Sequence, residues 1–269
     1  MAITALHSAA TGLRALSTRI DVVANNLANA ETTAFKGSRM NFEDLFYLNM
    51  RQPGTVNSSG EVSPGGIQVG LGTKISNTQL DLTQGSLENT GRPLDVGIQG
   101  QGFFAVKILP SVGNGIGYSR NGNFVVNKNG ELVLNIGDGY KLIPAITIPQ
   151  NSTEITIGPD GTVSVLPAGQ TTVQTVGTLQ LTQFVNPQGL QLQGGSIYTE
   201  TGSSGPPTVN TPGQGGTGQI AQGFLEASNV DPVKELVTLI KTQRAFELNS
   251  QSIQTADQAL QTIANLKRS

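Results

Sequence analysis

The sequence lacks cysteine and tryptophan altogether and contains a single histidine. Without cysteine there is no disulfide framework, no thiol nucleophile and no cysteine-based zinc site. The lack of cysteine is compatible with an oxidising compartment but does not fix one. Charged residues are also scarce, at 13% of 269 residues with a formal net charge of −2. No basic stripe is available to neutralise phosphates, so nucleic acid is not expected as a partner.

Long hydrophobic runs are missing as well. No stretch approaches the ~18 consecutive apolar residues that a membrane-spanning helix needs, so membrane insertion is not expected. The first residues, MAITALHSAATGLRAL, have neither a basic start nor a continuous apolar block, unlike a secretory signal peptide. The sequence therefore predicts either a cytoplasmic protein or one that is exported by a route reading another signal.

Glycine and proline are abundant, and both are concentrated in the middle of the chain. Of 34 glycines only Gly12 precedes Gly37, and neither glycine nor proline follows Pro232. The two ends are therefore expected to be helical, and the middle to consist of short strands joined by turns. The strand candidates are residues 94–98, 103–109, 124–126, 131–134, 145–148, 154–157, 162–166, 176–184 and 220–226.

The predicted strands are separated by turn signals and by two longer stretches without a pattern. The turn signals include Asn121-Gly122, Asn129-Gly130 and Asp160-Gly161. Residues 51–72 and 194–218 are expected to be irregular. A long irregular stretch in a compact domain is unusual unless it has a binding role.

Apolar residues recur every seven positions in the N-terminal segment. Two adjacent rows predict a coiled-coil-like stripe of about four heptads, on a helix that would span ~40 Å over residues 3–30. The first row is Leu6, Leu13, Ile20 and Leu27, and the second is Ala9, Leu16, Val23 and Ala30.

The C-terminal segment repeats this pattern. Asp231 is a suitable N-cap, and Pro232 suits the first position of a helix. One row is apolar throughout, and its partner row is apolar only in the second half. The rows are Leu239, Phe246, Ile253 and Leu260, and Thr242, Asn249, Ala256 and Ile263. Together these features predict an α+β fold, with long N- and C-terminal helices paired as a coiled coil and a central, mostly antiparallel β domain.

The polar face of the C-terminal segment is unusual because Asp257 is its only charge between Leu248 and Leu266. A solvated helix face normally carries many charges, often paired along the helix. One interpretation is a helical hairpin packed on its own β domain. The other is that neighbouring copies cover these faces, since head-to-tail contacts that do not close generate helical filaments.

No catalytic, cofactor or metal template fits the sequence. The glycine-rich GIQGQG at 97–102 precedes another strand rather than a helix, so we interpret it as a hairpin turn and not as a dinucleotide loop. GLGTK at 70–74 lacks the residue order of a P-loop. His7 has no co-ligands nearby and is expected on a solvated helix face. Asp231 and Glu235 are better explained by helix capping than by acid–base chemistry.

Four stretches carry a resemblance to a known family. They are NNLANAETTAFK at 25–36, GRPLDVGIQGQGFFAV at 91–106, YSRNGNFVVNKNGELV at 118–133, and SNVDPVKELVTLIKTQRAFELNSQSIQTADQALQTI at 228–263. The first and last resemble the N- and C-terminal signatures of the bacterial flagellar axial proteins, the rod and hook family. The two middle stretches resemble the shared β core of that family.

A fifth stretch is more selective. FEDLFYLNMRQPGTVNSSGEVSPGGIQVGLGTK, at 42–74, resembles the extended insertion of the distal rod member, and YTETGSSGPPTVNTPGQGG at 198–216 is similar to the same member. One departure is Ala34, because the family commonly has glycine before the Phe-Lys pair. Glycine permits φ > 0 freely and alanine does not, so we expect a different local geometry at this helix exit.

The resemblance implies a structural subunit of the flagellar distal rod, not an enzyme, and no cofactor. Subunits exported by the flagellar type III apparatus would polymerise into a helical tube in the basal body, across the periplasm. That tube would act as a rigid drive shaft that transmits motor torque to the hook. The implied partners are further copies of the chain, proximal rod and hook subunits, the export apparatus, and the surrounding peptidoglycan and outer-membrane ring proteins.

The resemblance also implies a division of the chain. Residues 1–36 and 228–269 would form the helices that pair and line the inner tube. Residues 37–74 would be an extended insertion that braces neighbours and stiffens the rod, and residues 75–227 the outer β domain. Assembly packing is expected from Leu6, Leu13, Ile20, Leu27, Phe246, Ile253, Leu260 and Ile263.

Asn25, Asn26 and Asn29 place three poor helix formers within five positions. We hypothesise that their amides make hydrogen bonds to adjacent subunits or to the helix exit, and so specify register. The alternative is that Asn29 simply ends the helix while the other two face water.

Two other functions stay open at this point. The first is another axial subunit, either proximal rod or hook. The second is a periplasmic module that binds or degrades cell-wall glycan, which would require a pair of carboxylates on the β domain.

Overall fold

The computed structural model describes residues 2–54, 64–111, 113–137 and 139–266. They divide into two compact units. The helical unit comprises the residues up to Ala28, Ser38–Gln79 and the residues from Asp231 onward. The β unit comprises Asn29–Gly37 and Leu80–Val230. The α+β class, with two terminal helices and a central antiparallel β region, is confirmed.

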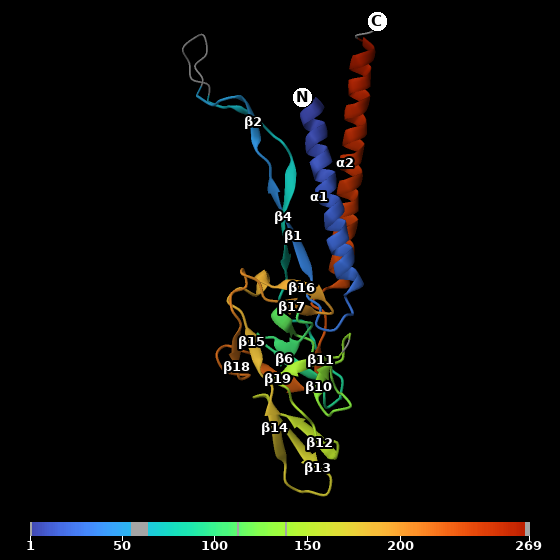
Figure 1. The fold of residues 1–269 in the computed structure, drawn as a ribbon. Helices are drawn as coiled ribbons and strands as arrows, with labels where there is room; N and C mark the ends of the chain where they lie inside the picture. The colour runs from blue at the N-terminus through green and yellow to red at the C-terminus, as the bar shows by residue number, and fades with distance from the viewer. Residues whose placement is uncertain (1, 55–63, 112, 138, 267–269) are drawn as a thin grey trace. The chain divides into compact units, whose positions relative to one another are not determined.

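The helical unit contains both long helices, α1 (Ala2–Ala28) and α2 (Pro232–Leu266). They lie side by side along much of their length (Figure 1). Each forms because it has good helix formers and almost no breakers, α1 having one glycine and α2 none. Neither described helix is long and apolar enough to cross a membrane.

The start of α2 confirms the predicted cap. The Oδ1 atom of Asp231 accepts hydrogen bonds from the backbone N–H of Val233 at 2.9 Å and of Lys234 at 3.2 Å. Pro232 occupies the first helical position, where a missing N–H costs nothing. Local sequence chemistry therefore fixes where this helix begins.

Residues 38–79 add a two-stranded ribbon to the helical unit (Figure 1). β1 (Ser38–Asp44) pairs with β4 (Thr73–Leu80), and β2 (Tyr47–Arg51) pairs antiparallel with β3 (Ile67–Gly70). The expectation that residues 51–72 are irregular is therefore wrong for 67–70, where Val69 lies opposite Leu48. Residues 55–63 of that stretch lie outside the described part. The sequence pattern of β2 and β3 is weak because neither strand has a fully buried residue, and burial of one face is what imposes a period-2 alternation of apolar residues.

The β unit is made of short strands, and its described strand pairs are antiparallel. Its largest sheet has seven strands in the order β16-β17-β8-β7-β11-β10-β9, and a second has the order β12-β13-β14. Three further pairs are β15-β18, β19-β6 and β20-β5. The strands are β5 (Leu87–Asn89), β6 (Val96–Gln99), β7 (Phe104–Lys107), β8 (Ile116–Ser119), β9 (Phe124–Val126), β10 (Leu132–Leu134), β11 (Tyr140–Ile143), β12 (Ser152–Ile157), β13 (Thr162–Pro167), β14 (Gln174–Thr178), β15 (Leu181–Gln183), β16 (Gln191–Gly194), β17 (Ile197–Thr199), β18 (Thr208–Asn210), β19 (Gln219–Gln222) and β20 (Phe224–Glu226). Two short 3-10 turns, Gly113–Gly115 and Pro187–Gly189, complete the unit.

Several strand predictions need correction. The predicted strands 176–184 and 220–226 are each two strands, which pair with different partners. Residues 145–148 form only an isolated bridge at Thr147, and the strand lies just before them in β11. The stretch 194–218, predicted to be irregular, contains β17 and β18. Sheet partners far away in sequence decide these positions, and local patterns do not report them.

The turn signals were accurate where the two flanking strands pair with each other. Asn129-Gly130 joins β9 to β10, and Asp160-Gly161 joins β12 to β13. The GIQGQG stretch, however, is not a hairpin turn: β6 pairs with β19, whereas β7 pairs with β8 and β11. It connects two sheets instead. Asn121-Gly122 likewise lies between β8 and β9, which are not neighbours.

Two apolar clusters form the core of the β unit. The larger one gathers aliphatic and aromatic side chains from most of the sheets, including Phe104, Phe124 and Leu134. The smaller one is aromatic, and within it Tyr118 stacks edge-on against Phe184 with ring centroids 4.8 Å apart. Such edge-on pairs add to the stabilisation from burial alone. The β unit thus has the core of an independently stable domain.

Candidate functional site: assembly faces and linker cluster

The predicted apolar row of α1 is only half-buried. Leu6, Leu13, Ile20 and Leu27 all keep part of their surface exposed. Among the described side chains of α1 the fully buried ones are Ala15, Val23 and Asn26, of which only Val23 belongs to a predicted row, the second. The first row, of leucines and an isoleucine, is not fully buried and remains available for further contacts.

Polar side chains of α1 hold the ribbon. Ser8 Oγ donates to the Gly70 carbonyl at 3.2 Å, and Thr11 Oγ1 accepts from the Thr73 N–H at 3.4 Å. Gly72 sits at φ +108°, and a methyl group there would lie 2.1 Å from Thr11 Oγ1, so only glycine fits. His7 is exposed as expected, but its Nδ1 also lies 3.1 Å from the Leu71 carbonyl oxygen, so the ring contacts the ribbon.

The predicted row of α2 is similarly incomplete. Leu239, Ile253 and Leu260 are half-buried, and Phe246 is exposed. The side chain of Ile263 lies outside the described residues. In the second row Thr242 is buried, and a methyl group at Gly12 of α1 would lie 3.4 Å from Nδ2 of Asn249. Small and polar residues therefore contribute to the contact between α1 and α2.

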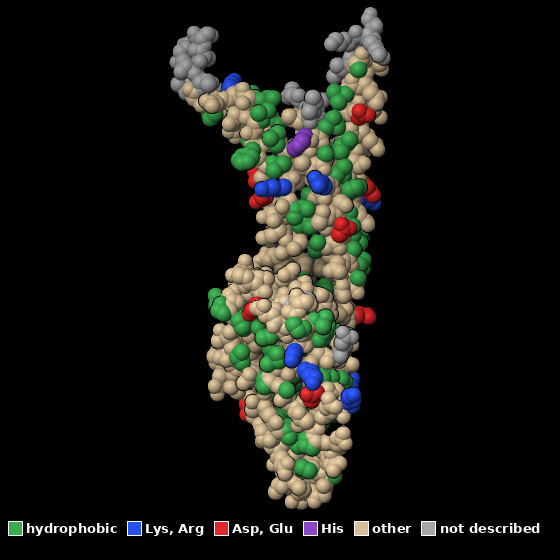
Figure 2. All heavy atoms as spheres, in the orientation of Figure 1, with side chains coloured by type: hydrophobic (Ala, Val, Ile, Leu, Met, Phe, Trp, Pro, Cys, Tyr) green, Lys and Arg blue, Asp and Glu red, His purple; other side chains and the backbone are tan. Residues whose placement is uncertain are grey.

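A second apolar stripe of α2 is the more exposed one. Val233, Leu236, Val237, Ile240 and Leu248 recur at helical spacing, with Val233 70% and Leu248 65% exposed. Figure 2 shows hydrophobic side chains along the helices among few charged ones. The heptad rows did not predict this stripe, although an i, i+4, i+7 reading of Val233, Val237 and Ile240 would have found it.

The ribbon is also apolar on its surface. Phe46 is 90% exposed, and Tyr47, Leu48, Met50 and Ile67 are exposed as well. Monomeric proteins rarely leave contiguous apolar surface of this kind uncovered, and such patches mark interaction sites. Together with the helices, the ribbon gives the helical unit more unpaired apolar surface than a self-contained domain would show.

The three asparagines have different environments. Asn26 is buried, and its amide makes two reciprocal 2.9 Å hydrogen bonds with the backbone N–H and carbonyl of Ser38. Asn26 therefore reaches the residue at which β1 begins and ties α1 to the ribbon. Asn25 is exposed. Asn29 follows the last residue of α1, and its Oδ1 accepts from Thr32 Oγ1 at 3.1 Å.

The β unit buries an ionic group that the sequence did not reveal. Glu226 Oε1 accepts from Lys36 Nζ at 2.6 Å and from the Gly85 N–H at 3.0 Å, and its Oε2 accepts from Arg120 Nε at 2.7 Å. Arg120 also donates to the carbonyls of Gly102 and Gly100. All three charged side chains are at least 95% buried. Burying a charge costs free energy unless the charge is paired and hydrogen-bonded, so the partners listed here are what stabilise the three charged side chains in the interior.

Asn229 extends this group. Its Oδ1 accepts from the Gly37 N–H at 2.9 Å, and its Nδ2 donates to the Asp81 carbonyl at 2.8 Å. Lys36 Nζ donates to the Thr83 carbonyl at 2.6 Å. We call this set the linker cluster: the side chains of Lys36, Arg120, Glu226 and Asn229, with the backbone of residues 34–37, 81–86 and 226–229 that they bind.

Burial lowers the pKa of the Lys36 ammonium below its ordinary value, and the neighbouring Glu226 carboxylate opposes that effect. The neighbouring Arg120 guanidinium lowers the pKa of Lys36 further, but less than burial does. Lys36 belongs to the N-terminal signature, Arg120 to the third quoted stretch, and Glu226 to no motif. Only the apolar setting of these charges could have hinted at burial.

Ala34 enters the linker cluster in an unexpected conformation. Its φ is +56°, in the left-handed region, and its N–H donates to the Glu226 carbonyl at 2.8 Å. The expectation of a different geometry at this helix exit is therefore wrong: alanine adopts the conformation in which glycine is favoured. Its methyl group is completely buried.

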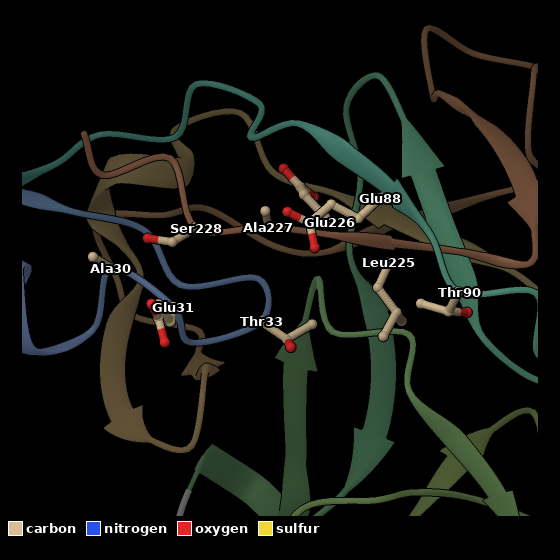
Figure 3. A pocket seen from close by; sticks show the side chains of 9 residues that line it. All are labelled: Ala30, Glu31, Thr33, Glu88, Thr90, Leu225, Glu226, Ala227 and Ser228. Atoms are coloured by element: carbon tan, nitrogen blue, oxygen red, sulfur yellow. The ribbon is translucent and has the colours of Figure 1, made fainter. Parts of the chain in front are cut away.

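A hollow of about 420 Å³ lies beside the linker cluster and contains three carboxylates (Figure 3). They are Glu31, Glu88 and Glu226. Both oxygens of Glu226 are engaged by cations and a backbone N–H, so this residue is unsuited to general acid or base work. Among the described residues no three His, Cys, Asp or Glu side chains are placed so that together they could hold a metal ion, and this includes the three carboxylates of the hollow.

These features define a class of protein. The closed β unit offers no catalytic constellation among its described residues, while the helical unit presents apolar stripes on helices and ribbon. That combination is typical of a structural subunit that completes its packing against other chains.

The comparisons with known proteins specify the class. Three family models match: "Flagella basal body rod protein" over residues 6–36, "Flagellar hook protein FlgE/F/G D1 domain" over 97–165, and "Flagellar basal body rod FlgEFG protein C-terminal" over 221–266. The chain is 48% identical to the flagellar basal-body rod protein FlgG of Buchnera aphidicola (subspecies Schizaphis graminum), covering 95% of this chain and 96% of the relative. It is 44% identical to FlgG of Caulobacter vibrioides, covering 98% and 99%. The chain belongs to the flagellar basal-body rod protein family.

Membership settles the broad function. The protein is a structural component of the flagellar basal-body rod, located in the basal body and involved in motility. The family consists of structural rod proteins rather than enzymes. It also implies self-assembly and association with other rod and hook components.

Proposed function

We propose that the protein polymerises into the distal rod, a helical tube that works as a rigid drive shaft between motor and hook. The observation that carries the proposal is the helical unit, which leaves apolar stripes uncovered on α2 and on the ribbon. Burying one Leu or Ile side chain contributes ~1.5–3 kcal/mol, so covering these stripes in a polymer would supply substantial stabilisation.

In this proposal α1 and α2 pair as a coiled coil and line the inner tube. Leu6, Leu13, Ile20 and Leu27 of α1 would meet neighbouring copies. The corresponding residues of α2 would be Phe246, Ile253, Leu260 and Ile263. Half-buried apolar rows support this, because a coiled-coil seam that were complete within one chain would be fully buried.

Successive segments of the chain would have different roles in the rod. Residues 1–36 and 228–269 would form the tube lining, residues 37–74 the brace between neighbours, and residues 75–227 the outer domain. The exposed aromatic and aliphatic side chains of the ribbon support a bracing role for the insertion. Register between copies would be aided by Asn25 and Asn29, while Asn26, whose amide is engaged by Ser38 of the same chain, would contribute by fixing the helix exit.

The further partners would be proximal rod and hook subunits at the two ends of the tube, the surrounding peptidoglycan and outer-membrane ring proteins, and the flagellar export apparatus. Export through a narrow channel is favoured if the helical ends are unfolded before assembly. The low content of charged residues supports a rod surface that slides without a strong electrostatic field.

Leu260→Asp tests the proposal. A carboxylate in the α2 row should block rod assembly and motility while the purified monomer keeps its unfolding transition, because Leu260 is only half-buried. The matched control is Gln258→Asp, which places the same charge two residues away at an exposed position. Motile cells with normal filaments from the Leu260→Asp strain would contradict the proposed packing.

A second experiment separates the distal rod from other axial subunits. Excision of residues 42–74 should yield a curved rod if the insertion straightens the tube. An unchanged rod shape in electron micrographs would favour a proximal rod or hook assignment. A cell-wall clearing assay on the purified chain addresses the glycan module, and we expect no clearing.

A further inference from the structure

The chain passes between the helical unit and the β unit four times, after residues 28, 37, 79 and 230. Each crossing adjoins a segment that the linker cluster holds. Residues 34–37 lie between the first two crossings, Asp81 follows the third, and Asn229 precedes the fourth. Force that passes along the chain from the helices therefore reaches the linker cluster, with the hydrogen bond from Ser196 Oγ to the Thr33 carbonyl as a further contact on the α1 side.

Two of these segments run in the same direction. The Ala34 N–H donates to the Glu226 carbonyl at 2.8 Å, and the Asn229 N–H donates to the Phe35 carbonyl at 3.4 Å. Partner numbers rise together, so the segments are parallel. A force that draws residue 29 toward the N-terminus and residue 230 toward the C-terminus slides one segment along the other. Sliding loads all of their hydrogen bonds together, whereas peeling would break them one at a time.

A third segment lies against both. The Asp81 N–H donates to the Gly37 carbonyl at 2.8 Å, and the Ala227 N–H donates to the Ser86 carbonyl at 2.8 Å. Lys36, Glu226 and Asn229 then cross-link the three segments through the side-chain bonds given above. Charge-assisted hydrogen bonds are stronger than neutral ones, and burial shields these from water.

We propose that the linker cluster is a mechanical clamp, which carries load from the two helices into the β unit and shields the β core from it. The parallel register and the buried cross-links support this role. In the cell the load would be motor torque, and that use rests on the proposed function. The clamp itself is a property of one chain and can be measured without a rod.

The test is forced unfolding of the full chain at constant force. Because the sequence has no cysteine, Ala5→Cys and Gln261→Cys give two unique attachment points on exposed positions of α1 and α2. Pulling between them unravels the helices and then loads residues 29 and 230. The rate at which the β unit then unfolds is the quantity compared between variants.

Asn229→Ala is the first variant, because it removes the bonds to Gly37 and to residues 81–83 without leaving a charge unpaired. Lys36→Met is the second and removes the ties to Thr83 and Glu226. The matched control is Val165→Ala, which weakens the β core at a fully buried site in β13, a strand that contributes nothing to the linker cluster. Chemical denaturation ranks the equilibrium stability of all three.

If the clamp exists, each clamp variant unfolds about 10- to 100-fold faster under load than Val165→Ala, at matched equilibrium stability. This is the range expected when a strong hydrogen bond is lost from the loaded contacts. Equal rates for clamp and control variants would overturn the proposal. That result would leave the rod assignment intact, since Leu260→Asp tests the assignment separately.

Discussion

The β unit and the helical unit bury different kinds of side chain. Large apolar residues such as Phe104, Phe124 and Leu134 are almost fully enclosed in the β unit. In the helical unit the described buried side chains are mostly small or polar, such as Ala15 and Asn26, while Phe46 and Val233 stay exposed. The β unit therefore completes its apolar core within one chain, whereas the helical unit needs contacts with other chains to cover its apolar side chains.

Charges follow the same contrast. The β unit encloses Lys36, Arg120 and Glu226, and both cations are paired with the one carboxylate. In the helical unit the Arg244–Glu247 pair lies at the surface with a 3.5 Å separation, and exposed pairs of this kind contribute little. Buried ion pairs are thus found in the β unit, whereas the described ion pairs of the helical unit lie at its surface.

Amide hydrogen exchange on the dilute monomer should separate the two units most widely. Opening free energies range from ~0 for weakly packed segments to the global value for core strands. We therefore expect fast exchange along α1 and α2 and slow exchange in β7, β10 and β13. Slow exchange along both helices would instead indicate a self-contained helical hairpin, and the contrast between the units would disappear.

Glu226→Gln should give the largest effect of any single substitution considered. It leaves Lys36 and Arg120 buried without a counter-charge, which typically costs ~3–5 kcal/mol of unfolding free energy. Lys36→Met should cost less, because Arg120 and Glu226 remain a balanced pair. Urea denaturation followed by circular dichroism measures both. Glu88→Gln, at an exposed carboxylate beside the same hollow, is the control.

The unfolding free energy should also depend on pH through Lys36. Because the pKa of Lys36 is lower in the folded chain than its ordinary value of 10.5, the unfolded chain binds more protons below pH 10.5. The unfolding free energy should therefore rise with pH as 10.5 is approached from below. Lys36→Met should lack this rise, and an equal rise in both proteins would contradict the assignment.

Asn26→Ala should have a smaller effect, confined to the helical unit. It leaves the N–H and carbonyl of Ser38 without their side-chain partners, at a cost of ~1–3 kcal/mol. Because Asn26 ties α1 to the ribbon, rod assembly and motility should fall while the unfolding transition of the β unit stays unchanged. Ser17→Ala, at another exposed position of α1, is the control. Normal motility of the Asn26→Ala strain would remove Asn26 from the assembly proposal.

The sequence was informative where structure is decided locally. The start of α2 with its Asp231 cap, and the turns at Asn129-Gly130 and Asp160-Gly161, depend on neighbouring residues, and all are found in the structure. The class of protein followed from terminal signatures that survive as linear motifs. Spacing alone, however, did not show which helix face would be buried, because the α1 face against the ribbon is polar and small.

The linker cluster lay beyond sequence reasoning for a physical reason. Lys36 and Glu226 are 190 positions apart, and nothing local distinguishes a lysine that will be buried from one that will be solvated. The pairing of β2 with β3 was missed because neither strand has a fully buried residue and therefore neither shows an alternating pattern. Contacts between residues far apart in the sequence, and strands that are exposed on both faces, are the two features that patterns in a single sequence report least.

Ala34 offers the smallest effect and a sharp test of what stabilises the helix exit. Ala34→Gly removes a left-handed penalty of ~1–2 kcal/mol. It also loses a buried methyl worth ~0.8 kcal/mol and adds backbone entropy to the unfolded chain worth ~0.5–1 kcal/mol. These contributions nearly cancel, so the unfolding free energy should change by less than ~1 kcal/mol in urea denaturation.

Ala34→Val is the matched contrast at the same position. A β-branched residue at φ +56° is strained, and the fully buried site has no room for two more methyl groups, so this variant should lose more than ~2 kcal/mol. A glycine variant as unstable as the valine variant would mean that the alanine methyl, rather than the left-handed backbone, is what the β unit requires here. A clear gain from glycine would mean that the chain stores backbone strain at the residue that binds Glu226, in the segment between α1 and the ribbon.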